Sequence, residues 1–159
     1  MYKSVRELRK MGVISVKIRG SVKEFDIVEE LRIDPENLDD LFRNHSEQFA
    51  FWRLLYEQMK TRWRNAVDIL QQQEDLYYIR YREDFRDKSE QYSDKTLMAF
   101  IRQTRELDIS RKEVRDCEKD MEMVKAVVDA FEHRKTCIMQ LGAKRRDDDR
   151  LLIRNRKEQ

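Results

Sequence analysis

The chain has 159 residues, which suits a single ordinary domain with a modest core and does not suit a two-domain enzyme. Charged residues make up 42% of the sequence, but 34 basic and 32 acidic side chains leave a net charge of only +2. Glycine occurs 3 times and proline once, whereas sandwiches, barrels and glycine-looped nucleotide-binding folds need these residues at many turns. The composition therefore predicts an all-α fold.

Charges interrupt every apolar stretch, so the sequence predicts no transmembrane helix, and the first residues lack the apolar core of a secretory signal. We therefore expect a cytoplasmic protein that makes no membrane contact. Cys117 and Cys137 would lie about 30 Å apart on one helix, which is too far for a disulfide. We expect both to be small hydrophobic residues in a reducing compartment.

Residues 1–32 form a basic N-terminal arm whose structure the sequence leaves open between a small helix or strand element and an irregular segment. Residues 13–19 alternate like a strand, whereas Ser4 to Glu7 and Ser21 to Glu24 match the capping box of a helix start. Residues 1–23 carry a net charge of +6, and residues 24–50 carry −7. Segments of like charge are often solvated surfaces. Alternatively, the basic and acidic segments of two chains contact each other, or the basic ends bind phosphate.

The clearest helix start is Asp34-Pro35, where Asp34 is a good N-cap and proline suits the first helical position. Ile33 and Leu38 occupy the positions of a hydrophobic staple. Apolar residues then recur at 4-3 spacing as far as Tyr77 and predict one helix over about residues 35–85. The large side chains of this seam are Phe42, Phe49, Trp52, Tyr56, Met59 and Trp63.

A second long helix is predicted over about residues 110–141, between a capping box at Ser110 and a stop at Gly142. Its seam includes Val124 and Phe131 and continues through Lys135. The connector, residues 88–109, has room for a short helix that begins at Asp94 or Thr96. Residues 33–145 would thus form a helical hairpin domain, and residues 146–159 a charged tail.

The first seam carries more large apolar side chains than one opposing helix covers. We therefore expect the hairpins to pair as coiled coils in a homo-oligomer larger than a dimer.

The sequence offers little that is typical of catalysis. No phosphate-binding glycine loop, Cys-x-x-Cys pair or His-Glu-x-x-His motif is present. His45 falls on the apolar seam, where a buried residue is expected rather than a general base. His133 and Cys137 are four residues apart and would supply only two of the four ligands of a zinc site. We therefore expect no enzyme activity, no catalytic residue, no metal and no cofactor.

Three tyrosines interleave with two arginines in residues 76–82, where the first seam stops being apolar. We expect this end of the helix to be exposed, with tyrosines free to stack on unpaired bases and arginines free to hold phosphates. The alternative is a solvated helix face with intrahelical ion pairs. The candidate DNA-binding residues are Tyr78, Arg80, Tyr81, Arg82 and Arg86, with Lys60 and Arg64 farther back.

The order of these features resembles the phage recombination mediators of the UvsY type over residues 33–145. The matching stretches are Ile33–Leu38, Tyr77–Arg82, Ser93–Leu97, Ala130–Lys135 and Leu141-Gly142. The resemblance implies a helical protein that forms rings, binds single-stranded DNA and helps a RecA-like recombinase displace single-strand DNA-binding protein. It also implies the host cytoplasm as the compartment, if the protein is phage-encoded.

The chain departs from the better-known members of that family, which carry basic residues just ahead of the paired tyrosines. Here Gln72, Gln73 and Glu74 occupy those positions, so the positive charge must come from the arginines that follow. Another candidate for the DNA site is the basic arm, with Lys3, Arg6, Arg9 and Lys10. The alternative hypothesis for the function is a coiled-coil adaptor or scaffold with no nucleic-acid role.

Overall fold

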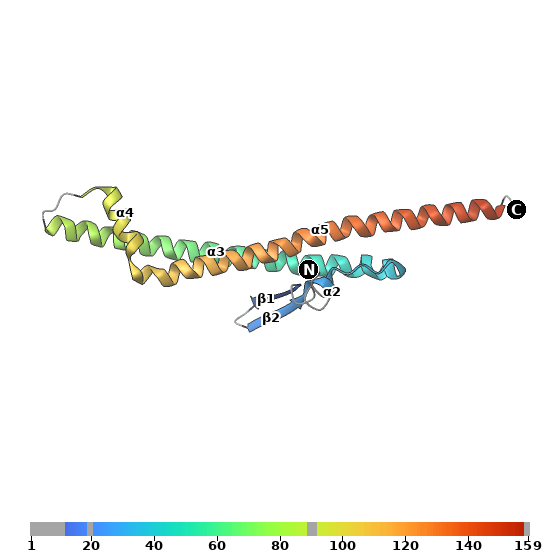
Figure 1. Cartoon of the computed structure of the whole chain (residues 1–159), viewed down its shortest axis with the longest axis horizontal. Helices are drawn as coiled ribbons and strands as arrows, with labels where there is room; N and C mark the ends of the chain where they lie inside the picture. Colours follow the sequence, from blue (N-terminus) through green and yellow to red (C-terminus); the bar gives the residue numbers. More distant parts are fainter. Residues whose placement is uncertain (1–11, 19–20, 89–91, 158–159) are drawn as a thin grey trace, which may run out of the picture. The chain divides into compact units, whose positions relative to one another are not determined.

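The computed structural model describes residues 12–18, 21–88 and 92–157 (Figure 1). The all-α prediction is confirmed apart from a small hairpin, since most described residues are helical. The elements in chain order are β1 (Val13–Ile18), β2 (Ser21–Asp26), α2 (Ile27–Glu30), η1 (Pro35–Asn37), α3 (Leu38–Asp87), α4 (Asp94–Gln103), η2 (Arg105–Leu107) and α5 (Asp108–Lys157).

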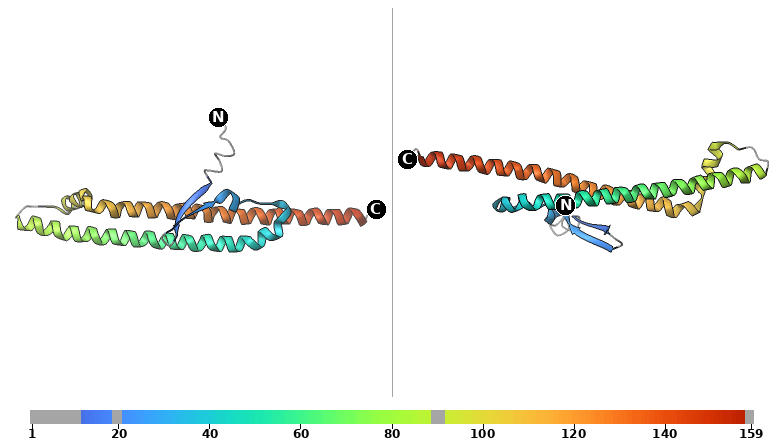
Figure 2. Two further views of the ribbon diagram at one scale, coloured as in Figure 1. Left: turned by 90° about the horizontal axis from the view of Figure 1, so that it is seen from below. Right: turned by 180° about the vertical axis from the view of Figure 1, so that it is seen from behind.

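The chain divides into two compact units, and the helices α3 and α5 each contribute to both. The first unit holds the described residues up to Tyr56 and those from Met123 onward, and the second runs from Glu57 to Glu122. Within each unit, the two helix segments run antiparallel and side by side (Figure 2). The helical hairpin predicted from the two apolar seams is therefore present within each unit.

The N-terminal arm contains an antiparallel hairpin, in which Ile14 pairs with Phe25 and Val16 with Lys23. Val16 is fully buried, and the Phe25 ring lies 4.9 Å from the Trp52 ring of α3. Of the alternatives that the sequence left open, the structure has the strand element, since Ser21 begins β2 and its hydroxyl donates to the carbonyl of Ile18. The other capping box, residues 4–7, lies outside the described residues.

The start of α3 follows the sequence prediction closely. The Asp34 side chain accepts a hydrogen bond from the Glu36 amide at 3.1 Å, and Pro35 begins the short helix η1. Leu38 is buried behind this cap. With η1, the helix covers residues 35–87, because no glycine or further proline interrupts the seam.

The core of the first unit is built where α3 meets α5 and the β-hairpin. Trp52, Val124 and Phe131 are fully buried, and the Trp52 indole donates to Glu30 Oε2 at 2.8 Å. The hairpin thus covers a part of the α3 seam that the sequence assigned to other chains.

The oligomer was predicted because the large apolar side chains of the α3 seam were judged too many for one opposing helix, but most of them are at least half-buried within the chain. Trp52 and Met59 are buried within the chain, and Phe49, Tyr56 and Trp63 are at least half-buried. Among the predicted seam residues, Phe42 alone is counted as exposed. One chain therefore buries most of this seam, and self-association stays a prediction.

In the second unit, α4 lies against α3 and buries Leu97 and Ile101. It begins at Asp94, one of the two predicted starts, with the Ser93 hydroxyl accepting a hydrogen bond from the Thr96 amide at 3.2 Å. Ser93 caps α4, because its hydroxyl oxygen accepts a hydrogen bond from an amide of the first turn that has no carbonyl partner within the helix.

The start of α5 differs from the prediction, because the helix begins at Asp108 after η2 and Ser110 lies inside its first turn. The Ser110 hydroxyl donates to Gln73 Oε1 of α3 at 2.6 Å. Its role is therefore to tie two helices together rather than to cap one.

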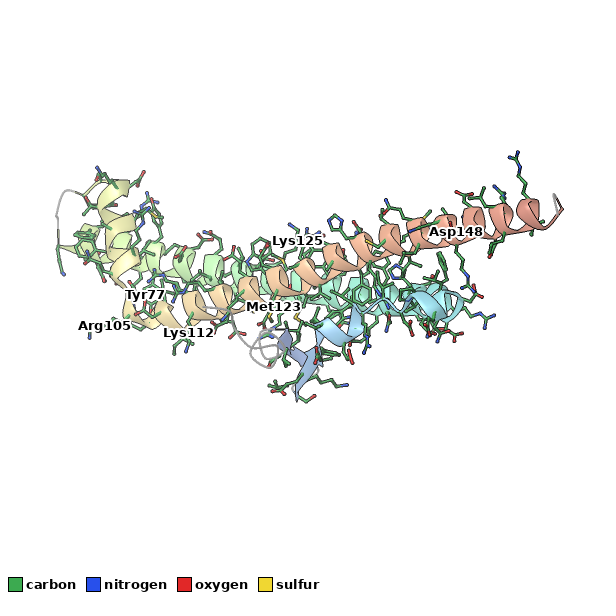
Figure 3. All side chains as sticks on the ribbon, turned by 45° about the vertical axis from the view of Figure 1, so that its right-hand side comes forward. Tyr77, Arg105, Lys112, Met123, Lys125 and Asp148 are labelled. Carbon is green, nitrogen blue, oxygen red and sulfur yellow. The ribbon has the colours of Figure 1, made fainter. Side chains whose placement is uncertain are left out.

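The predicted end of the second helix is also wrong, because α5 continues through Gly142 to Lys157. Residues 146–157, which were expected in a charged tail, are therefore the last turns of this helix, where Asp148 is labelled in Figure 3. Every described side chain from residue 143 to residue 154 is exposed. No proline follows the glycine, and the flanking residues favour helix, so the helix tolerates one glycine.

Replacing Gly142 with Ala tests this continuous helix. A Cβ there would lie 3.5 Å from Phe42 Cε2, which is an ordinary contact, so Gly142→Ala should raise the free energy of unfolding by up to about 1 kcal/mol. Ala143→Gly is the matched control and should lower it by a similar amount. Urea unfolding measures both, and a destabilising Gly142→Ala would mean that the helix ends at this glycine.

Candidate nucleic-acid interface

The tyrosines of the predicted DNA site lie on the last turns of α3, where α4 covers them. The Tyr78 hydroxyl donates to Asp94 Oδ1 at 2.9 Å, and the hydroxyls of Tyr81 and Thr104 share a hydrogen bond of 2.9 Å. The Tyr81 ring also lies 5.9 Å from the ring of Phe100. Tyr78 and Tyr81 are therefore half-buried, and the expectation that this end exposes its tyrosines is wrong.

Two features explain why the tyrosines are covered. The seam of α3 does not lose its partner at Tyr77, because α4 replaces α5 as the neighbour of the last turns. The rings of Phe85 and Phe100 lie 5.4 Å apart and extend the same apolar contact. The hydrogen bond with Asp94 raises the pKa of Tyr78, so the neutral hydroxyl is the form that the site holds.

The arginines of the segment are exposed, but they do not form one cluster. Arg80 and Arg82 are two residues apart and therefore project about 200° apart around the helix. Arg82 and Arg86 are one turn apart and share a side of α3. Arg86 lies 3.9 Å from Asp87, an exposed ion pair that holds the guanidinium only weakly.

Lys60 and Arg64 lie on the same side of α3 as Tyr78 and Arg82, because 18 residues make five full turns. The two pairs are about 27 Å apart along the helix axis. Asp68 and Asp75 project between them on this side, so negative charge separates the two pairs. The structure thus groups Arg82 with Arg86 at the end of α3 and leaves Lys60 and Arg64 as a separate basic site.

Sequence reasoning missed Arg111, which holds the corner between α4 and α5. Its guanidinium donates to the carbonyls of Ile101, Arg102 and Thr104 at 2.7–3.2 Å, and it lies 3.5 Å from Glu74 of α3. Figure 3 labels Arg105 and Lys112 at this corner and Tyr77 on α3. No local signal in the sequence indicated this role, because Arg111 lies inside α5, eight residues beyond the end of α4, and reaches the α4 carbonyls only because the chain turns there.

The first unit contains a buried polar cluster that sequence reasoning also missed in part. The seam of α5 passes through Arg134 rather than Lys135, and Arg134 donates to Gln48 Oε1 at 2.8 Å and to the Arg32 carbonyl at 3.2 Å. His45 is buried as predicted, with its ring 6.0 Å from that of Phe49. These groups tie elements of the core together, and both His45 and Arg134 are buried.

His133 and Cys137 are both exposed on α5. Among the described residues, no three His, Cys, Asp or Glu side chains gather where they could hold a metal ion. Cys117 is buried, which raises the pKa of its thiol and favours the unreactive form. None of the helices in the described ranges is long and apolar enough to cross a membrane.

Comparisons of the chain with protein-family profiles, with curated proteins and with solved structures found no match. The resemblance to UvsY-type mediators therefore rests on the sequence motifs alone. The placement of the arginines and tyrosines is the structural observation from which a function can be argued.

The burial of His45 predicts a pH-dependent stability. Burial and the charges of Arg134 and Lys135 lower the pKa of His45 below its ordinary value of 6.5. The unfolded chain therefore binds the proton more readily than the folded chain. The stabilising contribution of neutral His45 is present above pH 6.5 and is lost as the pH falls toward the lowered native pKa.

His45→Phe keeps a ring in the stack and removes the titrating group. Urea unfolding from about pH 7.5 to about pH 5.5 should show a smaller loss of stability for this variant than for the unmodified chain. His133→Gln, on the exposed side of α5, is the control and should keep the original pH dependence. If the free energy of unfolding changes with pH equally for His45→Phe and for the unmodified chain, His45 is not the source of the pH dependence.

Proposed function

We propose that the chain is a helical single-stranded DNA-binding protein that acts as a recombination mediator. In this role it helps load a RecA-like recombinase onto DNA covered by single-strand DNA-binding protein. The observation that carries the proposal is the end of α3, where exposed arginines stand beside an ordered group of packed tyrosines. Guanidinium groups bind phosphate oxygens in a fixed fork geometry, which suits a contact with the DNA backbone.

In this proposal, Arg82 and Arg86 make the main backbone contact, because they share one side of α3 and remain exposed. Tyr78 and Tyr81 hold α4 in place through their hydroxyl groups. Lys60 and Arg64 form a second contact farther along α3, beyond Asp68 and Asp75. Several weak contacts on each chain would combine by avidity if the protein self-associates.

The second candidate is a helical adaptor or scaffold without a nucleic-acid role. The observation that favours it is the state of the tyrosines, whose hydroxyls are already bonded within the chain. Glu83, Asp84 and Asp87 also lie among the arginines and reduce the local positive charge. The two candidates predict opposite results for binding of a single strand at low salt.

Arg82→Ala with Arg86→Ala tests the site. Fluorescence anisotropy with a labelled single-stranded oligonucleotide should show weaker binding across sequences. The slope of log affinity against log salt should fall by about 0.7 for each lost phosphate contact. Arg43→Ala with Arg115→Ala removes two other exposed arginines and should leave the slope nearly unchanged.

Tyr78→Phe keeps the ring and removes only a hydroxyl that is committed to Asp94, so its binding should match that of the unmodified chain. Absence of binding by the unmodified chain at low salt would favour the scaffold. If Arg43→Ala with Arg115→Ala weakens oligonucleotide binding as much, the DNA is attracted by the overall charge of the protein and not by a site at the end of α3. Loss of binding only after removal of Lys3, Arg6, Arg9 and Lys10 would place the site on the arm.

A further inference from the structure

The solvent-facing side of α3 in the second unit carries a continuous face without charge. Seven successive positions at 3–4-residue spacing hold only amide, hydroxyl or aliphatic side chains, in a chain of which 42% is charged. The members of this outer face are Gln58, Thr61, Asn65, Ile69, Gln72, Leu76 and Ile79.

This face lies away from the other helices of its unit. Ile69, Leu76 and Ile79 keep 53%, 68% and 53% of their surface exposed, whereas Met59 and Ala66 of the same helix are buried. A face of about six helical turns without a charged side chain is unusual for a solvated helix, which normally carries charges at its exposed positions. The pattern is that of a second helix–helix seam, separate from the one that packs within the chain.

We propose that this outer face binds a second copy of the chain in a parallel, in-register pairing of the two α3 helices. In this arrangement each seam residue meets itself, so Ile69, Leu76 and Ile79 form apolar layers. Gln72 meets the partner's Gln72, and paired amides can bond to each other, which sets the register. Glu83, the next position, ends the uncharged face.

The charges beside the seam favour the parallel direction. In a parallel pair, a residue that flanks the seam on one side faces the partner residue five positions later on the other side. Asp75 then faces the partner's Arg80, and symmetry repeats this contact. In an antiparallel pair with Ile69 facing Ile79, Asp68 faces Arg82, but Asp75 meets its own copy, where like charges repel.

The apolar part of the face is short, so the pair should be weak. Three aliphatic side chains on each chain bury far less surface than a standard stable interface. The inference goes beyond the proposed function, because it concerns a contact that forms without DNA. Its test is therefore independent of the oligonucleotide experiment.

Charge reversal across the seam tests the pairing by sedimentation equilibrium of the full chain without DNA. Asp75→Arg and Arg80→Asp should each weaken self-association, roughly tenfold in the dissociation constant. An equimolar mixture of the two variants should restore association, because each reversed residue then faces its opposite. Leu76→Gln should abolish association without unfolding the chain, since Leu76 is exposed.

Asp68→Arg is the matched control, because in the parallel register it faces the uncharged Gln73 of the second copy. It should leave association unchanged. A loss for Asp68→Arg without a loss for Asp75→Arg would overturn the parallel direction and support the antiparallel one, in which reversal of Asp75 exchanges one pair of like charges for another. A monomeric unmodified chain at high concentration, or failure of the mixture to restore association, would overturn the proposal.

Discussion

The fold of the second unit depends on one guanidinium group at the corner between α4 and α5. Arg111 donates to three carbonyls at the end of α4 while it pairs with Glu74 of α3 and Asp108 of its own helix. A helix end leaves its last carbonyls without partners, and this arginine supplies them where the chain turns. The corner fixes where α5 begins and places Ser110 against Gln73, so it sets the register of α5 on α3 in this unit.

The same corner determines what the candidate DNA site can be. Because Thr104 and Asp94 bond the tyrosine hydroxyls, the rings serve to hold α4, and the exposed arginines remain as the groups that can reach a phosphate. The outer face of α3, turned away from these contacts, stays open to another chain. One helix would then carry three separate functions on three sides: packing, phosphate binding and self-association.

Strong local signals in the sequence predicted local structure well. The Asp34-Pro35 cap and the apolar seam placed α3 almost to the residue, because caps and 4-3 spacing act within a few residues. Contacts between segments far apart in the sequence could not be predicted from caps and spacing. The covering of Trp52 by the hairpin and of Tyr81 by α4 depends on how the chain folds back. The Ser110 prediction failed because α5 begins earlier, at Asp108, and the Gly142 prediction failed because a helix continues where its neighbours favour it.

The most direct test of this account is the stability of Arg111→Ala. Loss of its bonds should lower the free energy of unfolding by roughly 2–3 kcal/mol, and hydrogen exchange should show α4 amides losing protection first. Arg115→Ala, an exposed arginine one turn later on α5, should change stability by less than about 0.5 kcal/mol. Equal, small effects for the two variants, with α4 still protected, would contradict the claim that Arg111 holds the corner.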